Sequence, residues 1–156
     1  MFVIRRAESR DIEAVLRLLV QVNMVHHKIR PDLFHGPATK YTEEELAQII
    51  SCPQTPVFVA EDLGKVLGHC FCVLQTHPGH NILTDITTLY IDDLCVDENV
   101  RGNHIGKQLY DYAIRFAKEK GCYNVTLNVW AGNDSALEFY KRQGLKPQKY
   151  GLETIL

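Results

Sequence analysis

Hydrophobic residues recur with two different spacings along this chain. In some stretches they alternate with polar residues or form short runs, which is typical of strands, and in others they recur at helical spacing. The first spacing predicts strands at Phe2–Ala7, Val57–Glu61, Val66–Gln75, Thr87–Val96 and Val125–Val129, and one or two more within Leu145–Leu156. The second predicts helices from Ser9 to near His26, through Thr42–Ile50, from Ile105 to Gly121 and from Asn133 to Gly144.

Residues that begin helices, end helices or turn strands agree with these boundaries. Thr42 and Glu45 have the spacing of a capping box. Gly121 and Gly144 follow the last apolar positions of two predicted helices, where glycine takes the left-handed conformation that ends a helix. Asp62–Lys65 is a short turn with a glycine between two strands and therefore predicts a hairpin.

The order of the elements indicates the fold class. A strand and two helices come first, then a meander of three strands, and then helix, strand, helix and strand. This order predicts an α/β fold with a mixed sheet and helices on its faces. At 156 residues the chain has the length of one domain with one core, so we expect a single domain over residues 1–156.

Composition narrows the class of protein. A hydrophobic content of 46%, a charged content of 23% and a net charge of -2 are ordinary for a globular protein and give no general attraction to nucleic acid or to an anionic membrane. No apolar run is long enough to span a bilayer, and the first residues lack the apolar core of a signal peptide. The five cysteines lack framework spacing, which fits a reducing compartment, so we expect a cytoplasmic protein.

The loop Arg101–Lys107, between a predicted strand and a predicted helix, has the chemistry of an anion site. It places glycines and basic residues at a helix N-terminus, where free backbone N–H groups and the helix dipole favour negative charge. A nucleotide P-loop needs four residues between its glycine and Gly-Lys, and then Ser or Thr. Here three residues separate Gly102 from Gly106, and Gln108 takes the hydroxyl position. A dinucleotide fingerprint would follow the first strand of a βαβ unit, which this loop does not.

Two adjacent acids lie in the middle of the predicted strand Thr87–Val96. Side chains alternate between the two faces of a strand, so Asp92 and Asp93 are expected on opposite faces. Because this strand is predicted to be central, at least one carboxylate must be paired, be neutral or face a cavity. A structural salt bridge and a carboxylate in an active-site cleft are both compatible with the sequence.

Three stretches together resemble the motifs of the GCN5-related N-acetyltransferase (GNAT) superfamily. Arg101–Gly106 is similar to its acyl-CoA motif, Q/R-x-x-G-x-G/A, and Leu94–Val96 is similar to the end of its fourth strand. Asn133–Leu145 is similar to N-x-x-A-x-x-F-Y-x-x-x-G-F, with Leu145 in place of the usual phenylalanine. His104 stands where the superfamily usually has a glycine, and histidine enters the left-handed backbone region more readily than most residues.

The resemblance implies a fold and an activity. The fold would be the acyl-CoA N-acyltransferase fold, with a mixed, mostly antiparallel central sheet splayed between its fourth and fifth strands and helices on both faces. The activity would be transfer of an acetyl group from acetyl-CoA to a primary amine by direct attack in a ternary complex, without a metal. The acceptor would be a small-molecule or protein amine. A non-catalytic CoA-binding regulatory module is the alternative, motivated by His104. Many members form dimers, so the resemblance allows a homodimer.

The resemblance also implies where acetyl-CoA binds. The pyrophosphate would bind the backbone N–H groups of the loop, and the pantetheine would pair along the fourth strand like an added strand. This requires the fourth strand to leave the fifth, which a β-bulge near Asp92 and Asp93 would cause. The residues expected to contact CoA are Leu94, Cys95, Val96, Arg101, Gly102, Asn103, His104, Ile105, Gly106, Lys107, Asn133, Ala136 and Tyr140.

For the chemistry, the resemblance implies a base for the amine and an acid for the leaving thiolate. Asp92 is expected to be the base, with Asp93 as the alternative because a bulge shifts the phase of a strand. Tyr140 is expected to be the acid. Pro31 disfavours helix at the residue before it, so His26–Phe34 is expected to be a loop that lines the acceptor pocket. The residues expected to contact the acceptor are His27, Arg30, Phe34 and Asp92.

A cluster of histidines and cysteines raises the question of a metal site. Cys70 and Cys72 would share one face of their strand and His69 would take the other, with His77 and His80 in the following loop. C-x-C is not the usual zinc-binding pair. We therefore expect buried cysteines and no metal site.

Overall fold

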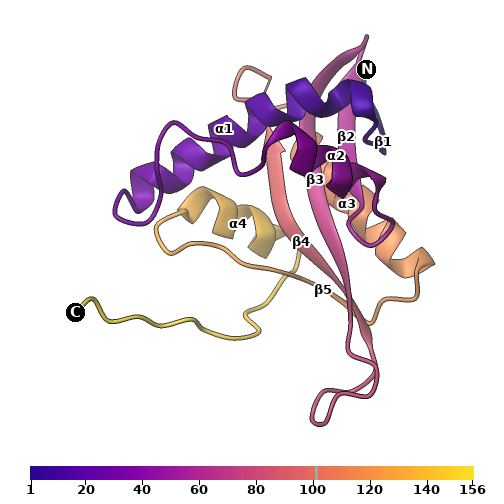
Figure 1. The fold of residues 1–156 in the computed structure, drawn as a ribbon, viewed down its shortest axis with the longest axis vertical. Coiled ribbons are helices and arrows are strands. Elements are labelled where there is room, and N and C mark those ends of the chain that lie inside the picture. The colour runs from indigo at the N-terminus through magenta and orange to yellow at the C-terminus, as the bar shows by residue number, and fades with distance from the viewer. Residues whose placement is uncertain (101) are drawn as a thin grey trace.

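The computed structural model of the chain describes residues 1–100 and 102–156 (Figure 1). The strands are β1 (Val3–Arg6), β2 (Val57–Asp62), β3 (Lys65–Thr76), β4 (Thr87–Val96) and β5 (Asn124–Leu127). The helices are α1 (Ile12–Ile29), α2 (Glu43–Ser51), α3 (Ile105–Glu119) and α4 (Asp134–Arg142), with a short 3-10 turn at Ser9–Asp11 before α1. Up to α4, this is the predicted order of elements.

The five strands form one sheet in the order β1-β2-β3-β4-β5. The first four strands are antiparallel to their neighbours, whereas β5 is parallel to β4. β4 and β5 pair only from Thr88, opposite Asn124, to Ile91, opposite Leu127, although β4 continues to Val96. The sheet is therefore mixed, mostly antiparallel and splayed between its fourth and fifth strands, as predicted.

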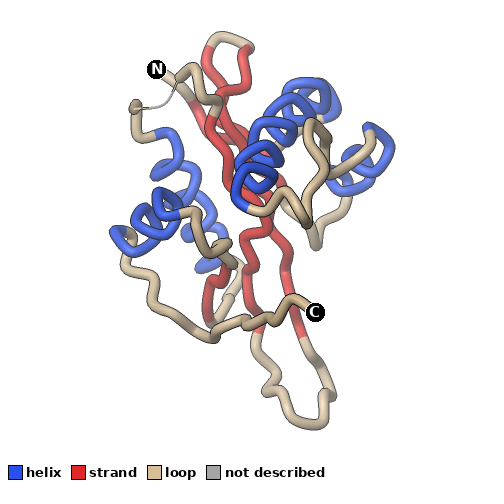
Figure 2. The backbone as a smooth tube through the Cα atoms, turned by 90° about the vertical axis from the view of Figure 1, so that its left-hand side faces the viewer, coloured by secondary structure: helices blue, strands red, loops and turns tan. Residues whose placement is uncertain are grey.

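Helices cover both faces of the sheet, which also confirms the prediction (Figure 2). Helices α1 and α2 pack on one face through a buried cluster that includes Leu46 and Phe71. Helix α3 packs on the other face through Leu109, and Phe139 and Tyr140 of α4 join the same cluster. Burial of these apolar side chains is the main favourable contribution to folding, so it fixes the layers between which the site lies.

Local signals explain where the helices begin and end. The Thr42 hydroxyl accepts a hydrogen bond from the Glu45 N–H, and the Thr42 N–H donates to the Glu45 carboxylate, as the predicted capping box requires. Gly121 and Gly144 have φ of 72° and 93°. Both lie in the left-handed region that glycine enters without a steric penalty, so both predicted helix ends are confirmed.

Helix α1 is longer than predicted. It runs to Ile29, past the predicted end near His26, and only Arg30 leaves the helical conformation, with φ −134° and ψ 73°. The prediction is wrong because Pro31 restricts only the residue directly before it. Ser9 does not cap α1 but begins the 3-10 turn. None of the described helices, α1 included, is both long and apolar enough to cross a membrane.

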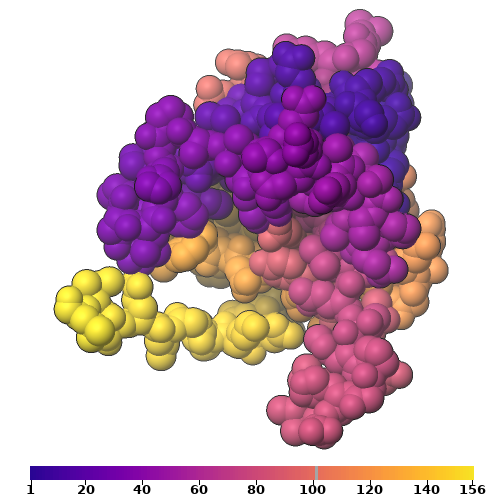
Figure 3. Space-filling view, in the orientation of Figure 1, coloured from indigo at the N-terminus to yellow at the C-terminus, as the bar shows by residue number. Residues whose placement is uncertain are grey.

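The C-terminal segment contradicts the prediction of one or two strands within Leu145–Leu156. These residues form no helix or strand, and the end of the chain projects from the rest of the molecule (Figures 1 and 3). A strand needs a partner, and no backbone hydrogen bond joins this segment to β5 in the described part of the chain. Pro147 lacks an amide hydrogen and Gly151 lacks a side chain to pack, and both oppose pairing. β5 likewise ends at Leu127 rather than at the predicted Val129.

Candidate active site

The separation of β4 from β5 coincides with a β-bulge at the two acids. Phe71 of β3 pairs with Asp93, but the next residue, Cys72, pairs with Ile91, so Asp92 is an extra residue in β4. An extra residue bends a strand and shifts its phase. This is the bulge that the resemblance implied, and the pairing with β5 ends at the residue before it.

Both carboxylates contact groups on the α1–α2 side of the sheet. Oδ2 of Asp93 lies 2.5 Å from Nε2 of His69 on β3. Oδ2 of Asp92 accepts hydrogen bonds from Nζ of Lys40 at 2.7 Å and from the hydroxyl of Tyr41 at 3.3 Å. Tyr41 packs against the buried cluster that α1 and α2 form. The prediction that the two acids point to opposite faces is wrong, because the bulge interrupts the alternation.

Burial and nearby charges shift the pKa values of two groups beside the acids, Lys40 and His26. Burial lowers the pKa of Lys40, but the hydrogen bond to Asp92 and the nearby negative charges together outweigh it and leave that pKa above its ordinary value. Burial lowers the pKa of His26 on α1, which Asp93 opposes and Lys40 reinforces. Near neutral pH, Lys40 is therefore an ammonium and His26 a neutral imidazole.

The predicted anion loop leads directly into α3. Gly102 has φ 100°, and His104 has φ 57° and ψ 24°, so His104 takes the left-handed conformation that the motif usually gives to glycine. The N–H groups of Gly106 and Lys107 have no acceptor among the described residues, as is typical of the first turn of a helix. Arg101 lies outside the described residues. Of the other loop residues, Asn103, His104 and Lys107 are exposed and Ile105 is buried.

The loop lies against β4 and α4, so the three motif stretches meet. A β-carbon at Gly106 would lie 3.5 Å from Cγ2 of Val96 on β4 and 3.9 Å from Cζ of Phe139 on α4. The Lys107 ammonium instead lies 2.7 Å from the carboxylate of Asp111 on the surface of α3. The first turn of α3 therefore approaches the end of β4 at Gly106, which carries no side chain.

Residues 92–96 of β4 have no pairing with β5 in the described structure. Leu94 and Val96 pack against the cluster on the α3 side, whereas Cys95 is buried in the cluster on the α1–α2 side. Alternation between the two faces therefore resumes after the bulge. The strand edge that would receive the pantetheine therefore begins at the bulge and leads toward the α3 loop.

Helix α4 places Tyr140 in the α3-side cluster. Its ring packs 5.1 Å from that of Phe139 and 6.4 Å from that of Tyr110, measured between ring centroids. Burial raises the pKa of Tyr140 strongly, and negative charge at Cys70 and Asp93 would raise it further. The phenol is therefore protonated near neutral pH and lies within electrostatic reach of the acid at the bulge.

Asn133 caps the N-terminus of α4. Its side-chain oxygen accepts a hydrogen bond of 3.4 Å from the Ala136 N–H, as its position before the helix requires. The Asn133 amide nitrogen has no hydrogen bond among the described residues. The predicted CoA contact at Asn133 therefore has a free donor.

The residues predicted to line the acceptor pocket lie at the end of α1 and in the loop after it. Nδ1 of His27 lies 2.7 Å from the carbonyl oxygen of Phe34. Arg30 forms an ion pair with Glu153 in the C-terminal segment. The Phe34 ring packs edge-on against Trp130, at 5.3 Å between centroids. The structure therefore brings Phe34 to the connection between β5 and α4, whereas His27 and Arg30 hold the loop and the C-terminal segment.

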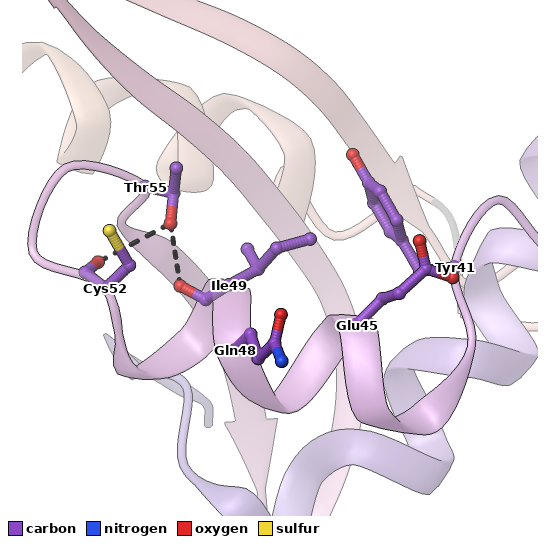
Figure 4. Close-up of a pocket in the computed structure, with 6 residues that line it drawn as sticks. All are labelled: Tyr41, Glu45, Gln48, Ile49, Cys52 and Thr55. Carbon is purple, nitrogen blue, oxygen red and sulfur yellow. Dashed lines mark hydrogen bonds between the residues drawn. The ribbon is translucent and has the colours of Figure 1, made fainter.

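A shallow groove of about 330 Å³ lies beside α2 (Figure 4). Its lining residues are Tyr41, Glu45, Gln48, Ile49, Cys52 and Thr55. The Thr55 hydroxyl donates to the carbonyl oxygen of Ile49 at 2.7 Å, which ties the end of α2 to the turn before β2. Tyr41, through its bond to Asp92, links the groove to the acids, but none of the predicted site residues lines it.

Sequence reasoning missed the partners of the two acids. Lys40 and Tyr41 directly precede the Thr42 cap, and nothing in their spacing relates them to β4. His69 entered only as a possible metal ligand, and residues 1–100 and 102–156 contain no group of three or more His, Cys, Asp or Glu side chains placed to hold a metal ion. Cys70 and Cys72 do share a strand face, with their Sγ atoms 3.7 Å apart.

A family comparison identifies the class of this site. Residues 4–145 match the model of the Acetyltransferase (GNAT) family. The chain belongs to the GNAT family. The splayed strands, the glycine-containing loop and the tyrosine of α4 are thus parts of a GNAT domain.

Individual relatives agree with this assignment. An uncharacterized N-acetyltransferase of Methanocaldococcus jannaschii is 35% identical over 95 residues, which cover 59% of this GNAT chain and 39% of that protein. Thialysine N-epsilon-acetyltransferase of Bos taurus is 28% identical over 154 residues, which cover 90% of this chain and 82% of that enzyme. A crystal structure of a mutant BH1408 protein from Bacillus halodurans is 31% identical and superposes with a TM-score of 0.93 over 99% of both chains. The predicted fold is confirmed.

Proposed function

We propose that this GNAT enzyme transfers the acetyl group of acetyl-CoA to a primary amine by direct attack in a ternary complex. The observation that carries the proposal is the opening of the sheet at the bulge, beside the N-terminus of α3. A strand edge can bind an extended chain such as pantetheine through its backbone, and a helix N-terminus suits a pyrophosphate. The two features adjoin because Gly106 faces Val96.

The residues around this opening fit acetyl-CoA as the second substrate. Loop residues 102–107 would bind the pyrophosphate through backbone N–H groups, and Arg101 is retained as a contact from the family motif. The absence of a side chain at Gly106 leaves space for the pantetheine between β4 and α4. The free amide nitrogen of Asn133 would donate to the pantetheine, and a backbone N–H of β4 near Leu94 would polarise the thioester carbonyl.

In the proposed reaction, the amine nitrogen bonds to the acetyl carbon as the carbon–sulfur bond breaks. An alkyl ammonium has a pKa of roughly 10.4, so a carboxylate must first take its proton. Each carboxylate has Oδ2 engaged and Oδ1 without a hydrogen bond among the described residues. A proton on Asp92 would break its ion pair with the Lys40 ammonium, so the contacts favour Asp93 for this step. Tyr140 would give its proton to the leaving sulfur. Asp92 remains the alternative base.

The charges at the acids bear on the class of acceptor. The Lys40 ammonium already neutralises Asp92. The acceptor therefore needs no positive charge besides the amine that is acetylated. The name of the Bos taurus relative describes acetylation of a side-chain amine of an amino acid. We propose a primary amine of a small molecule or of a lysine side chain as the acceptor.

Release of the CoA thiol in the presence of an amine panel tests the proposed function. The panel should contain lysine, thialysine, a polyamine, an aminoglycoside and a lysine peptide. We expect thiol release that depends on one class of amine, with an equal amount of acetylated amine found by mass spectrometry. Tight binding of CoA without transfer to any amine would instead support the non-catalytic CoA-binding module.

Replacing Gly106 with valine should weaken CoA binding by about a hundredfold, or about 2.8 kcal/mol at 25 °C. The added methyl groups would lie between Val96 and Phe139, in the space proposed for the pantetheine. Gly106→Ala is the matched variant: its β-carbon makes only ordinary contacts in the free protein, so it should fold like wild type and lose about tenfold in affinity. Calorimetric titration with CoA measures both. A folded valine variant that keeps its affinity would show that CoA binds elsewhere.

A further inference from the structure

His69 is a buried polar residue that the proposed chemistry does not use. It lies on β3 opposite Val59 of β2, and its side chain is 0% exposed. Nε2 is bonded to Asp93, but Nδ1 is buried without a hydrogen-bond partner among the described residues. Nearly all buried polar atoms are hydrogen-bonded, so this exception indicates a role beyond packing.

The unpartnered Nδ1 determines which form of the ring fits. A doubly protonated ring would bury a positive charge and leave an N–H donor without an acceptor, and both cost free energy. A neutral ring with its hydrogen on Nδ1 would place two acceptors, Nε2 and Oδ2 of Asp93, 2.5 Å apart. A neutral ring with its hydrogen on Nε2 donates to Asp93 and leaves only a lone pair at Nδ1. His69 is therefore suited to donate from Nε2 to the carboxylate.

The other groups around Asp93 leave its second oxygen unengaged. His26 on α1, Lys40 before α2 and Tyr140 on α4 reach Asp93 electrostatically, and so does the Cys70 thiol on β3. None of them forms a hydrogen bond with Asp93 in the described part of the chain. Oδ2 is thus held on one side by the imidazole, and Oδ1 has no protein ligand.

We propose that His69 is a positioning residue that fixes Oδ2 of Asp93 and so presents Oδ1 to the acceptor amine. The proposal rests on the proposed acetyl transfer. The proton lost by the amine goes to Oδ1, directly or through water, while His69 keeps its hydrogen and touches neither substrate. A carboxylate that rotates freely must be ordered in each turnover, so loss of His69 should lower kcat rather than substrate binding.

Nitrogen-15 chemical shifts of the imidazole test the arrangement without reference to activity. We expect His69 to carry its hydrogen on Nε2 and none on Nδ1. The spectrum of His69→Gln assigns the signal by its absence. A ring with a hydrogen on Nδ1, alone or together with one on Nε2, would overturn the proposal.

Three variants separate positioning from packing. His69→Phe removes the donor and should lower kcat by about ten- to a hundredfold, with the KM for acetyl-CoA within about twofold of wild type. His69→Gln, whose side-chain amide can donate to Asp93, should recover most of this loss. Val59→Ala is the control, because it loosens the core directly opposite His69 and leaves the bond to Asp93 intact. A loss in His69→Phe no larger than in Val59→Ala, or no recovery in His69→Gln, would refute the positioning role.

Failure of this proposal is distinguishable from failure of the proposed function. If the wild-type protein releases no thiol with any amine, the proposed function fails, and the imidazole spectrum still tests the His69–Asp93 arrangement. If transfer occurs, His69→Phe should add little to the loss already caused by Asp93→Asn, because the group that His69 positions is then gone. Losses that multiply in the double variant would show that His69 acts on something other than Asp93.

Discussion

Replacing Tyr140 with phenylalanine should lower kcat for acetyl transfer by about two to four orders of magnitude and leave CoA affinity within about twofold of wild type. The substitution removes the proton that Tyr140 would give to the leaving sulfur but keeps the ring. That ring packs against Phe139 and Tyr110, so the helix should stay in place. Steady-state thiol release measures kcat, and titration with CoA measures the affinity.

Tyr110→Phe is the matched control for Tyr140→Phe. Tyr110 lies in the same aromatic cluster, and burial raises its pKa too, but it belongs to α3 and is given no role in the reaction. We expect Tyr110→Phe to retain kcat within about threefold, since it removes no proton donor from the reacting atoms. Unchanged turnover in Tyr140→Phe, or an equal loss in Tyr110→Phe, would remove Tyr140 as the acid.

The burial of Tyr140 also sets the pH range of the reaction. A phenol donates its proton only below its pKa, and burial moves the pKa of Tyr140 above the ordinary value for tyrosine. A raised pKa shifts the loss of the acid to higher pH. In wild-type enzyme, kcat should therefore show no fall from this group below about pH 10. A fall near neutral pH that disappears in Tyr140→Phe would contradict the assignment.

The sequence predicted the parts of this fold that local signals and motif spacing specify. The capping box at Thr42 and the glycines that end α3 and α4 depend only on a few neighbouring residues. They can therefore be recognised without knowledge of the tertiary structure. The bulge was expected because the resemblance required the strands to separate. Its effect on the acids was not foreseen, because strict alternation holds only while every residue of β4 has a partner on β3.

The remaining errors concern contacts between segments far apart in the chain. Lys40 reaches Asp92 because the connection between α1 and α2 lies over β4. Nothing in the sequence around either residue predicts this ion pair. The C-terminal segment has enough apolar residues for a strand, but a strand forms only where it pairs, and in the described part of the chain this segment does not pair with the outer edge of β5. In the sequence His69 was considered only in connection with a metal site, which was not expected, and its contact with Asp93 across the two strands could not be foreseen.

Asp93→Asn should lower kcat/KM by about two to three orders of magnitude near neutral pH, more than any other single substitution among the acids. The asparagine oxygen can still accept from His69, so the fold should hold, but the charge that takes the amine proton is lost. Without a base, the reaction depends on amine that is already neutral. The kcat/KM of the variant should therefore rise about tenfold per pH unit below the amine pKa of roughly 10.4, and the deficit should be largest at low pH.

Asp92→Asn is the matched control, because it neutralises the adjacent carboxylate at the same bulge. We expect a loss of about threefold to tenfold, since its oxygen is engaged by Lys40. A deeper loss in Asp92→Asn, with the steep pH dependence confined to that variant, would make Asp92 the base, and Lys40 would then have to leave it when the acceptor binds. Lys40→Met would test this step, because it would free Asp92 and raise the rate rather than lower it. Equal losses in both asparagine variants would mean that neither carboxylate acts alone and that the amine proton passes through water that both acids hold.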